Sequence, residues 1–109
     1  MNNRLDFNED IAVRCGLREA VLATHLWDTL WKDEESVYRF GRLWTRISQQ
    51  MLAARLPFLT RDMVQVSLAR LREDGIIKVG HFSDDRFDHT NWYAFTDVGM
   101  AMMEPETYA

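Results

Sequence analysis

The basic residues in the middle of the chain are the side chains best suited to chemistry, and that chemistry is the binding of anions. Between residues 39 and 78 there are eight basic and three acidic residues, so this segment carries +5 in a chain whose net charge is −4. The remaining residues therefore carry −9. A basic centre between acidic ends predicts a face that binds phosphate. The alternative is that these basic residues only form the solvent-exposed surfaces of two helices and bind nothing.

No group of residues has the spacing of a known catalytic or metal site. Asp84, Asp85 and Asp88 lie close together, but the glycine and the distal glutamate of a calcium-binding loop do not accompany them. The chain has no phosphate-binding glycine loop, nucleophile elbow, metalloprotease helix or dinucleotide fingerprint. We therefore expect a protein that is not an enzyme and that uses no metal or other cofactor.

The single cysteine and the three histidines also favour structural roles. Cys15 cannot form an internal disulfide, and the scattered histidines lack zinc-ligand spacing. We expect Cys15 to be a small core residue and His25 to be hydrogen-bonded at the edge of the core. Apolar stretches are short and interrupted by charges, so we expect a cytoplasmic protein with no membrane partner.

The size and balance of the chain predict one globular domain. It has 109 residues, of which 47% are hydrophobic. We expect the domain to cover residues 1–104, followed by a frayed tail at 105–109. Asn8 or Asp10 is suited to cap a first helix that ends at Gly16. A second helix is expected from Leu17 to about Asp33, with one apolar stripe formed by Ala20, Ala23, Trp27, Leu30 and Trp31.

The middle of the chain is predicted to contain a short strand and then a helix with one basic face. Residues 36–40 favour a strand, and residues 41–55 show helical spacing. The predicted apolar face holds Leu43, Trp44, Ile47, Met51 and Ala54, and the opposite face holds Arg42, Arg46, Gln49 and Ala53. Pro57 breaks this helix, and Thr60 is suited to cap the next one.

The last part of the chain predicts a helix followed by a hairpin. Residues 61–74 form a helix that buries Val64, Ser67, Leu68 and Leu71 and stops at Gly75. Residues 76–82 and 91–96 predict two strands joined by a polar loop at 83–90, and Asp97 begins a short last helix. This order predicts an α+β fold, mainly α: a winged helix-turn-helix with a small β-hairpin wing.

Four segments resemble a known family. They are CGLREAVLATHLW, SVYRFGRLW, LPFLTRDMVQVSLARLREDGII and HFSDDRFDHTNWYAFT. They are similar to the N-terminal winged-helix domains of phage and prophage replication-initiation proteins, the replisome-organizer or DnaD-type group, from about Gly16 to Thr96. The stretch Leu-Arg-Glu-Asp-Gly-Ile-Ile also resembles many bacterial winged-helix regulators. The resemblance implies non-catalytic binding of double-stranded DNA, in replication initiation or transcriptional regulation.

This interpretation assigns roles to particular side chains. The expected phosphate contacts are Arg39, Arg42, Arg46, Arg61, Arg70 and Arg72. On the recognition helix, Gln65 is suited to adenine, and Val66 and Ala69 are suited to a thymine methyl group. In the wing the candidate residues are Arg86 and His89, but Asp84, Asp85 and Asp88 would be repelled by phosphate unless the wing turns away from the duplex. The family usually carries several basic residues on the solvent face of the recognition helix and at the wing tip. Here the corresponding helix positions are Asp62, Val66, Ala69 and Glu73.

These departures and the net charge favour a second hypothesis. In it the domain is a protein-interaction module that docks on a replication or regulatory protein, or forms a homodimer. The docking surface would be the helix face around Met63, Val66 and Ala69, or the apolar end at Met100, Met102 and Met103.

Overall fold

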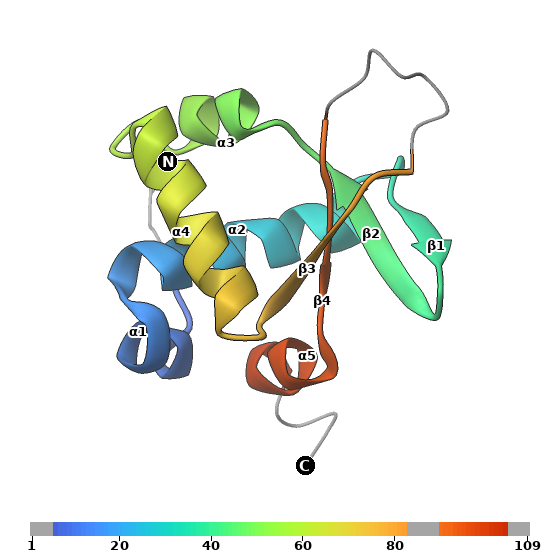
Figure 1. Cartoon of the computed structure of the whole chain (residues 1–109), viewed down its shortest axis with the longest axis horizontal. Coiled ribbons are helices and arrows are strands. Elements are labelled where there is room, and N and C mark those ends of the chain that lie inside the picture. Colours follow the sequence, from blue (N-terminus) through green and yellow to red (C-terminus); the bar gives the residue numbers. More distant parts are fainter. Residues whose placement is uncertain (1–5, 83–89, 105–109) are drawn as a thin grey trace.

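The computed structural model describes residues 6–82 and 90–104, and within them it is an α+β fold (Figure 1). The described elements follow one another as α1 (Glu9–Cys15), α2 (Leu17–Lys32), β1 (Val37–Arg39), β2 (Arg42–Arg46), α3 (Gln49–Arg55), α4 (Arg61–Glu73), β3 (Ile77–Gly80), β4 (Trp92–Phe95) and α5 (Asp97–Met103). The strands form one antiparallel sheet in the order β1-β2-β4-β3.

The two faces of the sheet have different surroundings. The register pairs Thr45 with Tyr93 and Ile77 with Phe95, and these side chains are buried in the core. Helix α2 packs on this face, where the Trp27 and Phe95 ring centroids lie 5.1 Å apart, edge to face. We call this side the core face of the sheet. The alternate residues of each strand must point to the opposite side, which we call the outer face.

Most predicted helices are confirmed, and local capping explains their starts. The Asn8 side chain accepts a hydrogen bond from the Ile11 amide at 3.0 Å, and Thr60 accepts one from the Met63 amide at 3.1 Å. Helix α4 buries the four side chains that its spacing predicted, and α5 begins at Asp97 as expected. The two strands of the β3–β4 hairpin are also confirmed. Their connecting residues 83–89 and the tail at 105–109 lie outside the described residues.

The helix predicted for residues 41–55 is wrong in its first half, and its predicted apolar face is also wrong in the second half. Met51 and Ala54, predicted on that face, are exposed, whereas Leu52 is buried. Residues Arg42–Arg46 form strand β2, which pairs with β1 on one side and β4 on the other. The helix begins only at Gln49, where the Ser48 side chain accepts a hydrogen bond from the Met51 amide. Leu43 and Trp44 therefore lie on opposite faces of a sheet instead of on one helical face.

Three further expectations need correction or refinement. Trp31, predicted on the buried stripe of α2, is 52% exposed and meets Trp27 edge to face. His25 is half-buried as expected, but its Nε2 atom has no hydrogen-bond partner among the described residues. Burial, with help from the charge of Arg55, lowers the pKa of His25. Cys15, expected in the core, is only half-buried and packs against the core from outside.

Candidate nucleic-acid interface

Helix α4 presents the three residues predicted to face bases on one exposed surface. Gln65, Val66 and Ala69 are all exposed, and Val66 is 54% exposed although it is apolar. The opposite side of α4 is buried through Val64, Leu68 and Leu71, which orients the helix. A solvent-facing, near-neutral surface flanked by charged residues is therefore available on this helix.

The charges around that surface are mixed. Arg61 lies in the first turn of α4, where the free backbone amides also favour an anion, and Arg72 is exposed in the last turn. Asp62 and Glu73 are exposed on the same helix. The positive potential along α4 is consequently weaker than its arginines alone would produce.

A buried carboxylate of α2, that of Glu19, connects α2 to α4. This residue was not identified from the sequence. Glu19 is almost fully buried and accepts a hydrogen bond from the Ser67 hydroxyl at 2.5 Å. Its other oxygen, Oε1, lies 3.5 Å from the Arg70 guanidinium. Arg70, predicted as a phosphate contact, is thus also the ion-pair partner of Glu19. The available signal was an acidic residue beside the apolar run Ala20–Ala23 of α2.

The three other predicted phosphate contacts do not join the α4 surface. Arg39, Arg42 and Arg46 all lie on the outer face of the sheet, as their pairing with one another and with Trp92 requires. Figure 1 shows β1 and α4 on opposite sides of the molecule. The structure therefore divides the six arginines into a group on the sheet and a group on α4.

Arg42 differs most from its predicted environment. Its side chain is only 18% exposed and donates a hydrogen bond to the Phe95 carbonyl at 2.9 Å. The same nitrogen lies 3.0 Å from the Asp97 carboxylate. The expectation that Arg42 lies on the basic face of a helix is wrong, because the residue belongs to strand β2 and its side chain bridges to the start of α5. The two wing residues, Arg86 and His89, lie outside the described residues.

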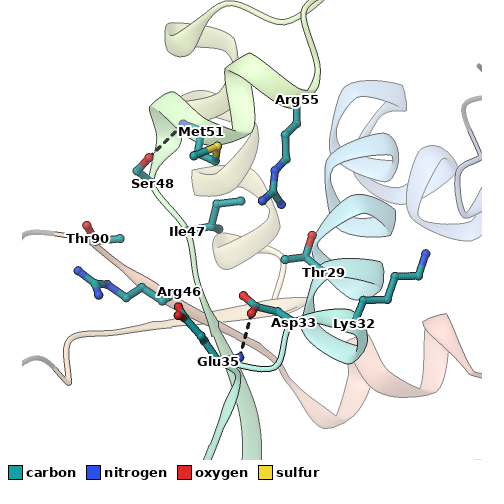
Figure 2. Close-up of a pocket in the computed structure, with 10 residues that line it drawn as sticks. All are labelled: Thr29, Lys32, Asp33, Glu35, Arg46, Ile47, Ser48, Met51, Arg55 and Thr90. Atoms are coloured by element: carbon teal, nitrogen blue, oxygen red, sulfur yellow. Dashed lines mark hydrogen bonds between the residues drawn. The ribbon is translucent and has the colours of Figure 1, made fainter.

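A polar hollow of about 590 Å³ opens between the end of α2, β2 and α3 (Figure 2). It contains three basic and two acidic side chains: Lys32, Arg46, Arg55, Asp33 and Glu35. In Figure 2, Arg55 reaches from α3 toward Thr29 of α2. Asp33 and Ser48 already accept backbone hydrogen bonds from Glu35 and Met51, respectively. These polar groups therefore stabilise a turn and a helix start.

A second hollow, of about 400 Å³, is mainly apolar. It lies beside the start of α4 and is lined by Phe7, Leu17, Arg18, Val21, Phe58, Leu59 and Met63. Leu17 and Phe58 are both at least half exposed. By contrast, the three methionines of α5 are partly buried against the core. The apolar surface near Met63 is therefore more open than the one at the C-terminal end.

Residues 6–82 and 90–104 contain neither a metal-binding cluster nor a membrane-spanning helix. No group of three or more histidine, cysteine, aspartate or glutamate side chains there is arranged to hold a metal ion. None of the helices described has the length and apolar character needed to cross a membrane.

Comparisons with known proteins found no relative of this chain. No family model, no curated protein and no solved structure matches the chain.

Proposed function

We propose that the protein is a non-catalytic winged-helix protein that binds double-stranded DNA through α4. The observation that carries this proposal is the arrangement of α3, α4 and the β3–β4 hairpin. Two helices joined by a short break are followed by a hairpin, and β2 pairs with the return strand of that hairpin. In a winged helix-turn-helix, the second helix of such a pair enters the major groove. The exposed surface of α4 is compatible with that role.

Within this interface, the side chains of α4 divide into two kinds of contact. Gln65 has an amide that can bond the N6 and N7 atoms of adenine, while Val66 and Ala69 suit a thymine methyl group. Arg61 and Arg72 are placed to neutralise phosphates at the two ends of the helix. The resemblance described above favours phage-type replication initiation or transcriptional regulation as the biological role.

The test is duplex binding measured against salt concentration. The full chain is titrated onto a labelled random duplex by fluorescence anisotropy, and the affinity is plotted against salt on logarithmic axes. Replacing Arg61 and Arg72 by alanine should lower the slope by roughly one for each lost contact. Gln65→Ala should leave the slope unchanged and alter the sequence preference selected from a random pool.

Lys32→Ala serves as the matched control, because it removes one positive charge from the last turn of α2. It should leave both the slope and the sequence preference unchanged. The proposal fails if the wild-type chain does not bind duplex at micromolar protein and low salt. It also fails if the Arg61 and Arg72 variants bind with the wild-type slope.

The apolar hollow beside α4 supports a second candidate function, self-association. A second copy would cover the exposed parts of Leu17 and Phe58. Under this hypothesis sedimentation shows a dimer at micromolar concentration, and Leu17→Asp makes the protein monomeric without unfolding it. A monomeric wild-type chain that binds duplex would favour the first proposal.

A further inference from the structure

The turn between β1 and β2 contains a residue that is poorly suited to its backbone. Arg39 pairs with Arg42, so Phe40 and Gly41 form a two-residue hairpin loop. Both have positive φ values, 53° for Phe40 and 75° for Gly41. Such a turn favours Asn, Asp or Gly at its first position, because a bulky side chain is strained there. Among the described residues other than glycine, Phe40 alone has a positive φ.

Burial of the ring does not explain this choice. Phe40 is 81% exposed. Its ring meets Phe82 at a centroid distance of 5.8 Å and a tilt of 53°. The residue therefore combines a strained backbone with a large apolar surface in solvent, a combination that is found at binding sites.

An aromatic cluster on the outer face of the sheet supports Phe40. Trp44 is the base of this cluster, with only 5% of its surface exposed, and Phe82 lies on it edge to face at 4.7 Å. Trp92 is 5.9 Å from Phe82. Gly80 allows this arrangement, because a Cβ atom there would lie 2.7 Å from the Phe82 ring and 3.1 Å from Trp44. The cluster is thus closely packed, and Phe40 is its exposed end.

Positive charge accompanies these rings. The Arg39 guanidinium carbon lies 5.4 Å from the centre of the Phe82 ring. All basic residues of the described strands, Arg39, Arg42, Arg46 and Lys78, belong to the outer face by register. These strands contain no acidic residue. Asp97 pairs with Arg42, and Asp33 and Glu35 line the polar hollow together with Arg46.

We infer that Phe40 and Arg39 form a binding site for single-stranded nucleic acid, in which an unpaired base stacks on the Phe40 ring. Proteins bind single strands by combining aromatic side chains, on which bases stack, with positive charge along the backbone path. The outer face supplies both within one hairpin, in a chain that is acidic overall. A negatively charged ligand with flat apolar rings fits this surface better than an apolar protein segment does. The site is separate from the duplex interface proposed for α4.

Phe40→Asn is the decisive variant. If Phe40 serves folding, this substitution should lower stability; if Phe40 serves binding, the substitution should raise stability and lower the affinity for single strands. Asparagine relieves the strain of the turn, so this variant should melt at a higher temperature than the wild type. It removes the stacking surface, so the affinity for a labelled oligodeoxythymidine of about 12 nucleotides should fall about tenfold. Arg39→Ala should weaken the same binding and reduce its salt dependence.

Two controls separate this site from the rest of the molecule. Phe58→Asn makes the same exchange at another exposed phenylalanine, between α3 and α4, and should leave oligodeoxythymidine binding unchanged. Gln65→Ala should also leave single-strand binding unchanged, while Phe40→Asn should leave duplex binding unchanged. Failure of the α4 proposal would therefore not affect this test.

The inference is overturned if the wild-type chain does not bind oligodeoxythymidine at tens of micromolar protein and low salt. It is equally overturned if Phe40→Asn binds the oligonucleotide as tightly as the wild type does, or if Phe58→Asn loses as much affinity. Binding that is weakened in Phe40→Asn but unchanged in Phe58→Asn and Gln65→Ala, together with a raised melting temperature of Phe40→Asn, supports it.

Discussion

The exposed side of α4 and the outer face of the sheet both contain basic residues, but they present them in different ways. On α4, arginines alternate with Asp62 and Glu73, and the most central positions are neutral. On the sheet, the strands carry basic residues and no acidic ones, beside an aromatic cluster. The +5 segment of the sequence therefore does not fold into one phosphate-binding surface.

The two regions are also supported differently. A polar network, in which Glu19 bonds Ser67 and pairs with Arg70, connects α4 to α2. Packed rings, with Trp44 at their base, support the outer face of the sheet. A substitution that damages one support should therefore leave the other region largely intact, and this difference can be measured.

The largest effect is expected at the base of the aromatic cluster. Trp44→Ala removes a buried ring and the hydrogen bond from its indole nitrogen to the Arg39 carbonyl at 3.0 Å. The free energy of unfolding should fall by about 3–5 kcal/mol, as for other large core truncations. Urea denaturation measures this change. An unchanged stability would mean that the cluster does not support the outer face.

The second effect concerns the support of α4. Glu19→Ala leaves the buried Ser67 hydroxyl without its acceptor and should lower stability by about 1–3 kcal/mol. Duplex affinity should fall as well, because α4 loses a contact that sets its position on α2. Oligodeoxythymidine binding should stay the same in the fraction that remains folded. Loss of both activities to the same extent would show that the two regions are not independent.

A smaller effect is expected at Arg42. Its guanidinium is tied to the Phe95 carbonyl and to Asp97, whose side chain is exposed, so Arg42→Ala should cost about 0.5–1 kcal/mol. The salt dependence of duplex binding should not change. A salt-dependence slope lowered by about one would instead show that Arg42 contacts a phosphate of the duplex.

The smallest effect concerns the thiol of Cys15, the last residue of α1. Burial, followed by its contact with Asp74, raises the pKa of Cys15 to about 12, so the native thiol should react slowly with iodoacetamide near neutral pH. The unfolded thiol titrates near 9.0. Because the pKa is higher in the folded than in the unfolded protein, deprotonation of the thiol favours unfolding. The stability of the folded protein is therefore unaffected by this thiol below pH 9 and decreases as the pH rises toward 12. The Cys15→Ala variant should therefore lose less stability than the wild type between pH 9 and pH 12. Rapid alkylation of the native chain would contradict the prediction.

Local signals in the sequence were sufficient for several elements. Asn8 and Thr60 cap the helices that their positions predicted, and the spacing of Val64, Leu68 and Leu71 identified the buried side of α4. These features depend on hydrogen bonds and periodicities within a few residues of the chain. The exposed positions of Gln65, Val66 and Ala69 followed from the same periodicity.

The error at residues 41–55 shows where such signals stop. Arg42 and Arg46 are four residues apart, a spacing that places two side chains on the same side of a helix and also on the same face of a strand. Only pairing with β1 and with the distant β4 selected the strand. The role of Glu19 likewise depends on Ser67, which is 48 residues away.

The amino-acid sequence by itself therefore determined the helix starts, the buried side of α4 and the excess of basic residues in the middle of the chain. The tertiary structure alone decided which of those basic residues share a surface, because sheet pairing and the packing of α2 on α4 join residues that no local periodicity connects. It also placed Phe40 at the end of an aromatic cluster, since that cluster combines side chains from β2, β4 and the residues that follow β3.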